Sequence, residues 1–237
     1  MEHQTVFERY EIKYLLDSRQ RDAVLRAMEP YMAPDQYDRS LVRNVYYDTP
    51  DYRLIRASLD RPVYKEKLRV RSYGAAGADD PVFVELKKKY REVVYKRRIL
   101  LPRAGAEAAL AGAVPLPDSQ IGREIAYALA LYRGLRPAVF LAYERQAYAA
   151  RDGSGLRITF DENIRYRCTG LSLGADSAGK PLLAPGRVLL EVKTGGSMPL
   201  WLARALAQQA VYKTSYSKYG AAYQDMNRTE QGVCRNA

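Results

Sequence analysis

Lys67-Leu68-Arg69-Val70-Arg71 is the stretch that says most about the fold, because charged and aliphatic side chains alternate along it without interruption. Successive side chains of a β-strand point to opposite faces, so Arg69 and Arg71 share one face while Leu68 and Val70 share the other. The same alternation recurs in four other segments, whose charged faces carry Arg9, Glu11 and Lys13; Glu85 and Lys87; Arg157 and Asp161; and Glu191 and Lys193. Several strands therefore repeat one pattern.

Taken singly, each of these strands fits an antiparallel sheet whose salt-bridged face lies in water. The repetition favours a charged interior instead, because adjacent strands that present many cations with a few carboxylates suit a polyanion and its metal ion. A closed sheet lined in this way would hold such a ligand inside. We therefore predict an α+β fold, an antiparallel β-tunnel or barrel of about eight strands with helices packed outside.

The chain has 237 residues, which is enough for one substantial core. We expect a single domain over 1–237, with its core at about 5–223 and a flexible C-terminal tail over 224–237. The 38 Lys and Arg against 27 Asp and Glu give a net charge of +11, which favours anionic partners without choosing among them. Because there is no zinc motif and the dense basic runs are confined to 87–89 and 96–98, no specific nucleic-acid partner is expected.

The cysteines and the apolar runs bear on the compartment. Cys168 and Cys234 lie far apart without metal spacing, which favours a reducing compartment. The start of the chain shows no signal-peptide pattern. The longest apolar run, Ile125–Tyr132, is far shorter than the ~20 residues that span a bilayer. We expect a cytoplasmic protein with no transmembrane segment of its own.

Alternation and turn residues predict the strands. They are expected at 5–16, 41–48, 64–73, 81–90, 92–101, 138–150, 156–160, 164–168 and 187–194. Two of them should form a hairpin that turns near Tyr90 and Arg91.

Apolar residues at helical spacing predict the helices. One follows Asp17 or Ser18, either of which can cap it, and reaches Tyr31. Another covers 121–132, and a shorter one falls within 102–118. The Gly-, Ser- and Pro-rich segment 170–186 should be a loop.

Two kinds of chemistry are disfavoured. The sole histidine is His3, near the start of the chain, so a catalytic triad, an imidazole metal cluster or a phosphohistidine is not expected. The segment GADSAGK at 174–180 imitates a phosphate-binding P-loop, but Pro181 stands where that motif needs a Ser or Thr hydroxyl. We interpret the segment as loop composition.

Six motifs in order resemble one known family. They are ERYEIKY at 8–14, RVRSYG at 69–74, VFVELKK at 82–88, LRITFD at 156–161, LLEVKT at 189–194 and SYSKY at 215–219. Together they resemble the VTC-type polyphosphate polymerase domain, in its stand-alone bacterial form, over about residues 7–223. That family belongs to the triphosphate tunnel metalloenzymes, so the resemblance implies a tunnel of antiparallel strands that holds a triphosphate and a divalent metal, Mn²⁺ or Mg²⁺.

The resemblance also implies roles for individual residues. Phosphate ligands of the tunnel would be Lys13, Arg69, Arg71, Lys87, Arg98, Arg145, Arg157 and Lys193. The substrate-binding set would also include the carboxylates Glu11 and Glu85. Lys87, Arg69 and Arg71 would act in catalysis together with Lys218, which matches a family lysine at the nucleotide end. Glu191 would bind the metal. Arg98 shares its face with Lys96, and only the strand register decides which of the two enters the tunnel.

The implied reaction moves the γ-phosphoryl group of ATP to polyphosphate and releases ADP. The expected partners are thus ATP and inorganic polyphosphate, and a membrane protein is a further candidate partner. Related hydrolases carry Glu-x-Glu-x-Lys in the first strand, whereas this chain has Arg9 in place of the first Glu, which points away from water activation. Ser215 stands where the eukaryotic pattern has another lysine. The alternatives are a tunnel-type triphosphatase or nucleotidyl cyclase, and a non-catalytic polyanion-binding module.

Overall fold

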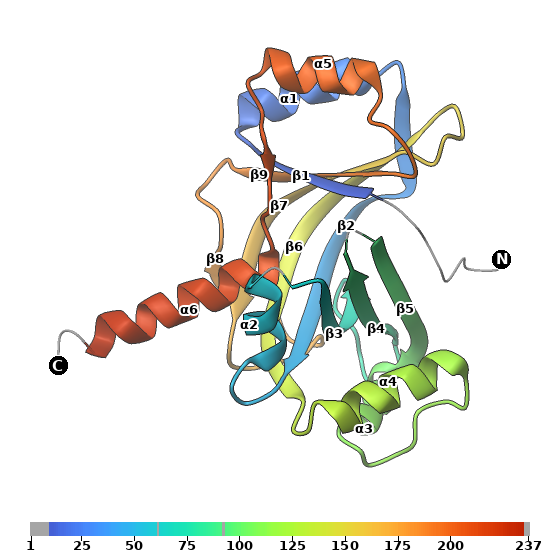
Figure 1. Ribbon diagram of the computed structural model, residues 1–237, viewed down its shortest axis with the longest axis vertical. Coiled ribbons are helices and arrows are strands. Elements are labelled where there is room, and N and C mark those ends of the chain that lie inside the picture. Colours follow the sequence, from blue (N-terminus) through green and yellow to red (C-terminus); the bar gives the residue numbers. More distant parts are fainter. Residues whose placement is uncertain (1–9, 61, 92, 235–237) are drawn as a thin grey trace.

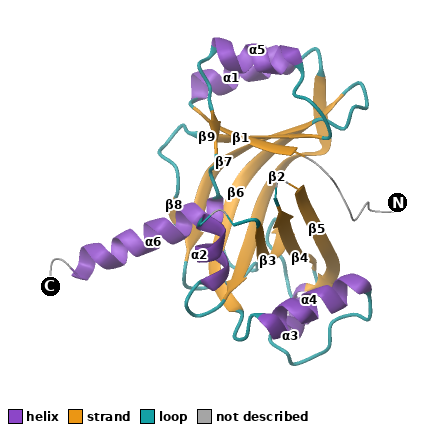
Figure 2. Ribbon diagram, viewed as in Figure 1, coloured by secondary structure: helices purple, strands orange, loops and turns teal. Residues whose placement is uncertain are grey.

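The computed structural model describes residues 10–60, 62–91 and 93–234, and its strands form one antiparallel sheet (Figures 1 and 2). The sheet order is β10-β1-β9-β7-β6-β2-β3-β4-β5, and β8 pairs with β7 beside this path. The strands are β1 (Tyr10–Leu16), β2 (Met32–Asp48), β3 (Tyr64–Tyr73), β4 (Pro81–Tyr90), β5 (Val93–Pro102), β6 (Arg136–Ala150), β7 (Arg157–Arg167), β8 (Lys180–Pro181), β9 (Val188–Thr194) and β10 (Lys213–Thr214).

The helices lie in three pairs around the sheet (Figure 2). They are α1 (Ser18–Met28), α2 (Arg53–Leu59), α3 (Arg103–Leu110), α4 (Gln120–Leu131), α5 (Leu200–Gln208) and α6 (Lys218–Cys234). In the part of the chain that the structure describes, every helix is too short or too polar to span a bilayer.

Two pairs cover the outer face of the sheet, the face that bears Leu68 and Val70. Val24 of α1 and Leu202 of α5 pack with Phe160 and the aliphatic residues of β1, β7 and β9. The aliphatic residues of β2, β3 and β4 pack with α3 and α4 in a second core. The alternation seen in the sequence thus separates two aliphatic cores from a charged inner face.

The third pair, α2 and α6, lies on the inner face, the face that bears Arg69 and Arg71. Ile55 of α2 and Tyr219 of α6 pack there with Val42 and Tyr46 of β2, and the Tyr46 and Tyr219 rings stack at 4.6 Å between centroids. This apolar cluster occupies one part of the inner face and leaves the charged part beside it.

Local sequence signals explain where several elements begin. The Asp17 carboxylate accepts the Gln20 backbone N–H at 2.8 Å and the Gln20 side chain returns a contact to the Asp17 N–H at 3.0 Å, which forms a capping box. Ser119 caps α4 by accepting the Gly122 N–H at 3.0 Å. Arg91 adopts a positive φ of 52° in the turn between β4 and β5, so the hairpin lies where the sequence predicts it.

The α+β architecture is confirmed, and eight of the ten strands are seven residues or longer. The backbone ladder does not close as a barrel would require, since within the described residues β5 and β10 are edges that pair with one neighbour each. Side chains span the gap instead: Glu11 of β1 meets Lys87 of β4 at 3.2 Å, and Lys67 of β3 meets Ser217 at 3.0 Å. We call these two contacts the seam.

Other differences concern boundaries. The strands expected at 156–160 and 164–168 are one strand, β7, because Asn163 with φ of 51° absorbs an irregularity without ending it. The helices α2 and α5 are not predicted from the sequence. The expected flexible tail is helical as far as Cys234, and Asp225 anchors it by accepting the Tyr166 hydroxyl at 2.5 Å. The expected start of the first strand, 5–9, lies outside the described residues.

Candidate functional site

The charged part of the inner face lines a cavity of about 350 Å³. Side chains of β1 to β7, β9 and the start of α6 contribute to it. Its cations are Lys13, Lys67, Arg69, Arg71, Lys87, Lys96, Arg98, Arg145, Arg157, Lys193 and Lys218. Among the described residues these eleven face only three lining carboxylates, Glu11, Asp35 and Glu191, so the cavity favours an anion.

Strand register explains how the ionic contacts form. Glu85 lies directly opposite Arg69 on one side and Arg98 on the other. It accepts the Arg69 Nε at 2.7 Å, and Lys96 Nζ lies 3.4 Å away, while its own side chain is only 2% exposed. Burial alone would raise the pKa of the Glu85 carboxyl, but Arg69, Arg71 and Lys96 hold it well below its usual range. Glu85 is therefore an ionised carboxylate that fixes the arginines.

A second buried carboxylate, Asp161, holds the opposite wall. It receives Arg145 through two hydrogen bonds, Nε at 2.6 Å and a terminal nitrogen at 2.7 Å, and Lys218 Nζ at 2.5 Å. The burial of Lys218 would lower its pKa, but Asp161 and Glu191 raise it above its ordinary value. Lys218 therefore stays charged at the α6 end of the cavity.

Glu191 and Glu11 converge on one ammonium group. Lys13 Nζ lies 3.2 Å from Glu11 Oε1 and 3.5 Å from Glu191 Oε1. The charge of Lys87 is the main cause that holds the pKa of Glu11 well below its usual range, against burial. Two ionised carboxylates that share a counter-ion suit a hard divalent cation such as Mg²⁺ or Mn²⁺. Since the described residues contain no group of three metal-ligating side chains, phosphate and water would supply the other ligands.

Neutral polar groups in and beside the cavity orient the arginines. Arg69 donates to the Tyr46 hydroxyl at 2.9 Å, and Arg71 donates to Asn44 Oδ1 at 2.8 Å and to the Tyr143 hydroxyl at 3.1 Å. Burial would raise the pKa of Tyr46, but Arg69 and Arg71 lower it. Each guanidinium is therefore held in one orientation before a ligand arrives.

The structure brings the predicted site residues together. All the predicted cations line the cavity, as do Glu11 and Glu191, and Glu85 lies directly beneath. Register does not exclude either candidate on β5: Arg98 and Lys96 both reach the cavity, with Arg98 stacked over Phe83 at 4.8 Å. Arg157 pairs with Asp35. The roles of these residues in binding and catalysis stay predictions, and Arg9 lies outside the described residues.

Several functional candidates were missed from the sequence. Lys67 and Asp161 share their faces with Arg69 and Arg157, so alternation alone could have added them to the site. Tyr46 and Asn44 lie in the segment NVYYD at 44–48. Its first four residues are uncharged, so charge alternation does not show which of them face the cavity. Only the pairing of β2 with β3, which sets Tyr46 opposite Arg69 and Asn44 opposite Arg71, identifies them.

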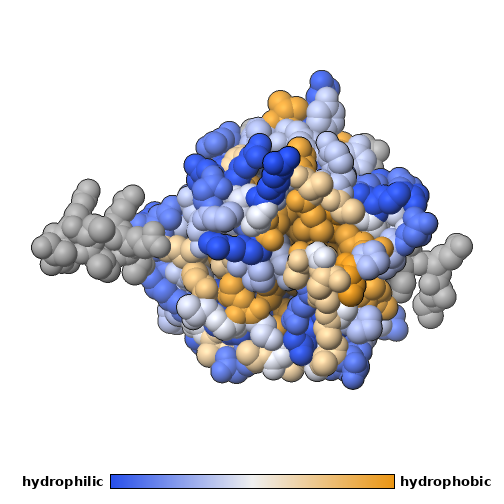
Figure 3. All heavy atoms as spheres, turned by 90° about the horizontal axis from the view of Figure 1, so that it is seen from below, coloured by the Kyte–Doolittle hydropathy of each residue, from blue (hydrophilic) through white to orange (hydrophobic). Residues whose placement is uncertain are grey.

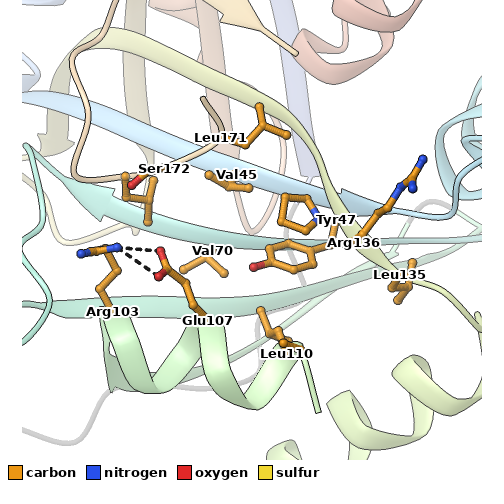
Figure 4. A pocket seen from close by; sticks show the side chains of 13 residues that line it. Val45, Tyr47, Val70, Arg103, Glu107, Leu110, Leu135, Arg136, Leu171 and Ser172 are labelled. Carbon is orange, nitrogen blue, oxygen red and sulfur yellow. Dashed lines mark hydrogen bonds and ion pairs between the residues drawn. The ribbon is translucent and has the colours of Figure 1, made fainter. Parts of the chain in front are cut away.

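A second cavity of about 410 Å³ lies on the outer face beneath α3 and has different chemistry (Figure 4). Val45, Val70 and Leu110 line it, and its polar group at one side is the Arg103–Glu107 pair at 2.9 Å. The surface at the α3 and α4 end also gathers apolar side chains between hydrophilic ones (Figure 3). The outer-face cavity, lined by the cations Arg103 and Arg136, is thus far less cationic than the cavity of the inner face.

Comparisons with solved structures show the same fold at low sequence identity. A candidate adenylate cyclase from Bacillus halodurans has 15% identity and a TM-score of 0.57, over 90% of this chain and 96% of that one. A candidate adenylyl cyclase from Hippeastrum with a dominant triphosphatase activity has 18% identity and a TM-score of 0.53, over 92% and 96%. Another from Vibrio parahaemolyticus has 16% identity and a TM-score of 0.51, over 91% and 98%.

The family assignment comes from the sequence itself. The model of the VTC domain matches residues 8–227, nearly the whole chain, whereas comparison with curated proteins gives no match. The matched range contains every residue that lines the cation-rich cavity. The chain therefore belongs to the VTC domain family and has the fold of the triphosphate tunnel proteins.

Proposed function

We propose that this protein is a metal-dependent polyphosphate polymerase that transfers the γ-phosphoryl group of ATP to the end of a polyphosphate chain and releases ADP. The observation that carries the proposal is the cavity itself, in which eleven cations surround the paired carboxylates Glu11 and Glu191. Membership of the VTC domain family supports the choice of polymer as acceptor.

The reaction needs charge stabilisation more than a protein nucleophile. The bond between the γ-phosphorus and the β–γ bridging oxygen breaks, ADP leaves with that oxygen, and a terminal oxygen of polyphosphate forms the new bond to phosphorus. The acceptor oxygen is already ionised, so no general base is required. Arg69, Arg71 and Lys87 would neutralise and align the phosphates, and Lys218 would hold the donor end.

Tunnel-fold enzymes generally depend on a divalent metal. Glu191 and Glu11 would hold it here, and the bound cation would neutralise charge on the phosphate oxygens. Lys13 lies between the two carboxylates and would keep them together before the cation and its phosphates bind.

The proposal is tested by incubating the purified protein with ATP and Mn²⁺, then measuring polyphosphate on a gel together with ADP and free phosphate. Polymer synthesis should fall about 100-fold in Lys87→Met and in Glu191→Gln, since each removes charge aimed at the phosphates. Lys88→Met is the matched control, because Lys88 follows Lys87 on β4 but faces outward and pairs with Glu124 at 3.0 Å.

The products also discriminate between the alternatives. Formation of ADP in proportion to the phosphate units added to the polymer supports the polymerase. Release of free phosphate or pyrophosphate without polymer would instead identify a tunnel-type triphosphatase or a nucleotidyl cyclase. Salt-sensitive binding of polyphosphate with no turnover and no metal requirement would instead identify a polyanion-binding module.

A further inference from the structure

Lys67 differs from its neighbours in the cavity by its contacts. Most of the lining cations touch a carboxylate, as Lys87 touches Glu11 and Lys96 touches Glu85. Among the described residues Lys67 has no such partner. Its Nζ instead donates to the Ser217 hydroxyl at 3.0 Å, across the seam from β3 to the residue that precedes α6.

The register of three strands makes this arrangement unfavourable in the absence of a ligand. Lys67 of β3 lies directly opposite Lys87 of β4, and Lys87 lies directly opposite Lys96 of β5. Like charges in directly opposed positions destabilise a sheet. The three ammonium groups form a row across the cavity wall, and we call them the lysine row.

The Ser217 hydroxyl can also donate a hydrogen bond into the cavity. Its oxygen accepts Lys67 Nζ at 3.0 Å and the Gly220 N–H at 3.2 Å. Because the Ser217 oxygen already accepts two hydrogen bonds, its hydroxyl hydrogen is available to donate to an incoming acceptor. Lys67 and Ser217 thus present donors side by side in the cavity.

We propose that Lys67, oriented by Ser217, is an additional phosphate-binding residue of the cavity, at its α6 end, and that an anionic phosphate oxygen supplies the counter-charge that Lys67 lacks. The inference rests on the proposed function in that it names a further contact to the same phosphate chain. In this proposal Lys67 binds the ligand, in addition to any contribution that it makes to packing.

Protonation gives this role a measurable signature. Burial lowers the pKa of Lys67 to about 7, and the charges of Lys13, Lys87, Lys65 and Arg69 lower it in the same direction. At pH 8 about nine-tenths of Lys67 would then be neutral in the free protein, so binding of an anion that needs the ammonium takes up close to one proton.

The experiment is titration calorimetry with inorganic tripolyphosphate at pH 8, without divalent metal, in two buffers of different ionisation enthalpy. The parent should take up about one proton more than Lys67→Arg, which keeps its charge at this pH. Equal proton uptake by the two proteins would overturn the inference. Failure of the parent to bind tripolyphosphate would overturn the proposed function as well.

A second pair of measurements separates binding from structure. Lys67→Met should raise the urea midpoint of the ligand-free protein, because it removes a like charge from the lysine row. The same variant should weaken tripolyphosphate binding about tenfold at pH 6.5. Lys67→Gln serves as a second variant, and Lys88→Met should change neither quantity. A lower midpoint with unchanged affinity would show that Lys67 is structural, against the proposal.

Discussion

Glu85 is the residue on which the cationic wall depends most. Its 2% exposed side chain contacts Arg69 and Lys96 and lies 3.9 Å from Arg71, so three cations share one buried carboxylate. Removal of one partner from a buried ion pair leaves an uncompensated charge, which is far more destabilising than loss of a surface pair.

We therefore expect Glu85→Gln to lower the free energy of unfolding by about 3–5 kcal/mol. Asp118→Asn is the control: Asp118 is 93% exposed and pairs with Arg123, so the loss of this charge should change stability by about 1 kcal/mol or less. Urea denaturation measures both. Tripolyphosphate should restore much of the stability of Glu85→Gln, because it binds only the folded state. Equal losses in the two variants would contradict this account of Glu85.

At the scale of elements, Asp48 at the end of β2 links α6 to α2 through hydrogen bonds. Tyr219 donates its hydroxyl to the fully buried Asp48 at 2.8 Å, and the same carboxylate accepts the Leu54 and Ile55 N–H groups at 2.8 and 3.0 Å at the start of α2. Asp48 therefore holds the first turn of one helix and the first turn of another.

Tyr219→Phe should destabilise the protein by about 1.5–3 kcal/mol, since it removes a hydrogen bond to a buried charged group. Tyr212→Phe provides the comparison, because Tyr212 is 81% exposed and should be nearly neutral. Hydrogen exchange can locate the effect: protection should fall in α2 as well as in α6. Loss confined to α6 would mean that Asp48 holds α2 without Tyr219.

Elements built by local alternation were predictable, and those built by tertiary contacts were not. The bounds of β3 and β4 follow from the sequence because charged residues recur at every second position over 65–71 and over 85–89. By contrast, α2 is only seven residues long, and the carboxylate that accepts its first N–H groups comes from Asp48 and not from the N-cap position, so the local sequence does not mark its start. Within the expected tail, the helix α6 makes a contact that is distant in sequence, that of Asp225 with Tyr166.

The candidate site divides in the same way. Alternation assigns each charged residue to a face, and this was sufficient to group Arg69, Glu85 and Glu191. It does not reveal which strands face one another across the cavity, and hence neither the Glu11–Lys87 contact nor the Lys67–Ser217 contact.

For the whole molecule, the balance of charge makes stability and binding respond to pH in opposite directions. Burial lowers the pKa of Lys96 and of Lys193 to about 8, despite the opposing carboxylates Glu85 and Glu191, and that of Lys67 to about 7. Between these values and the ordinary lysine value of 10.5, the folded state binds fewer protons than the unfolded state. Stability of the free protein therefore increases as pH rises from about 7 to about 10.

A bound polyanion reverses this trend, because it favours the charged lysines. We expect the urea midpoint without ligand to rise from pH 7 to pH 9, while the stabilisation given by tripolyphosphate declines over the same range. Below pH 4.5 the free protein should lose stability, since the depressed pKa values of Glu11 and Glu85 stabilise the fold only while these groups stay ionised. Parallel pH trends with and without tripolyphosphate would contradict the prediction.

The seam has one more consequence. No backbone ladder joins β1 to β4 in the described residues, and Lys87 reaches across to Glu11 at 3.2 Å. The Lys87 ammonium group that links the two strands is also one that we expect to bind phosphate. A phosphate that binds Lys87 must therefore compete with Glu11 for this ammonium group, whereas one that binds Lys67 displaces no carboxylate. Phosphate binding at Lys87 would thus exchange one anion for another, and it would release the side-chain contact that links β1 to β4.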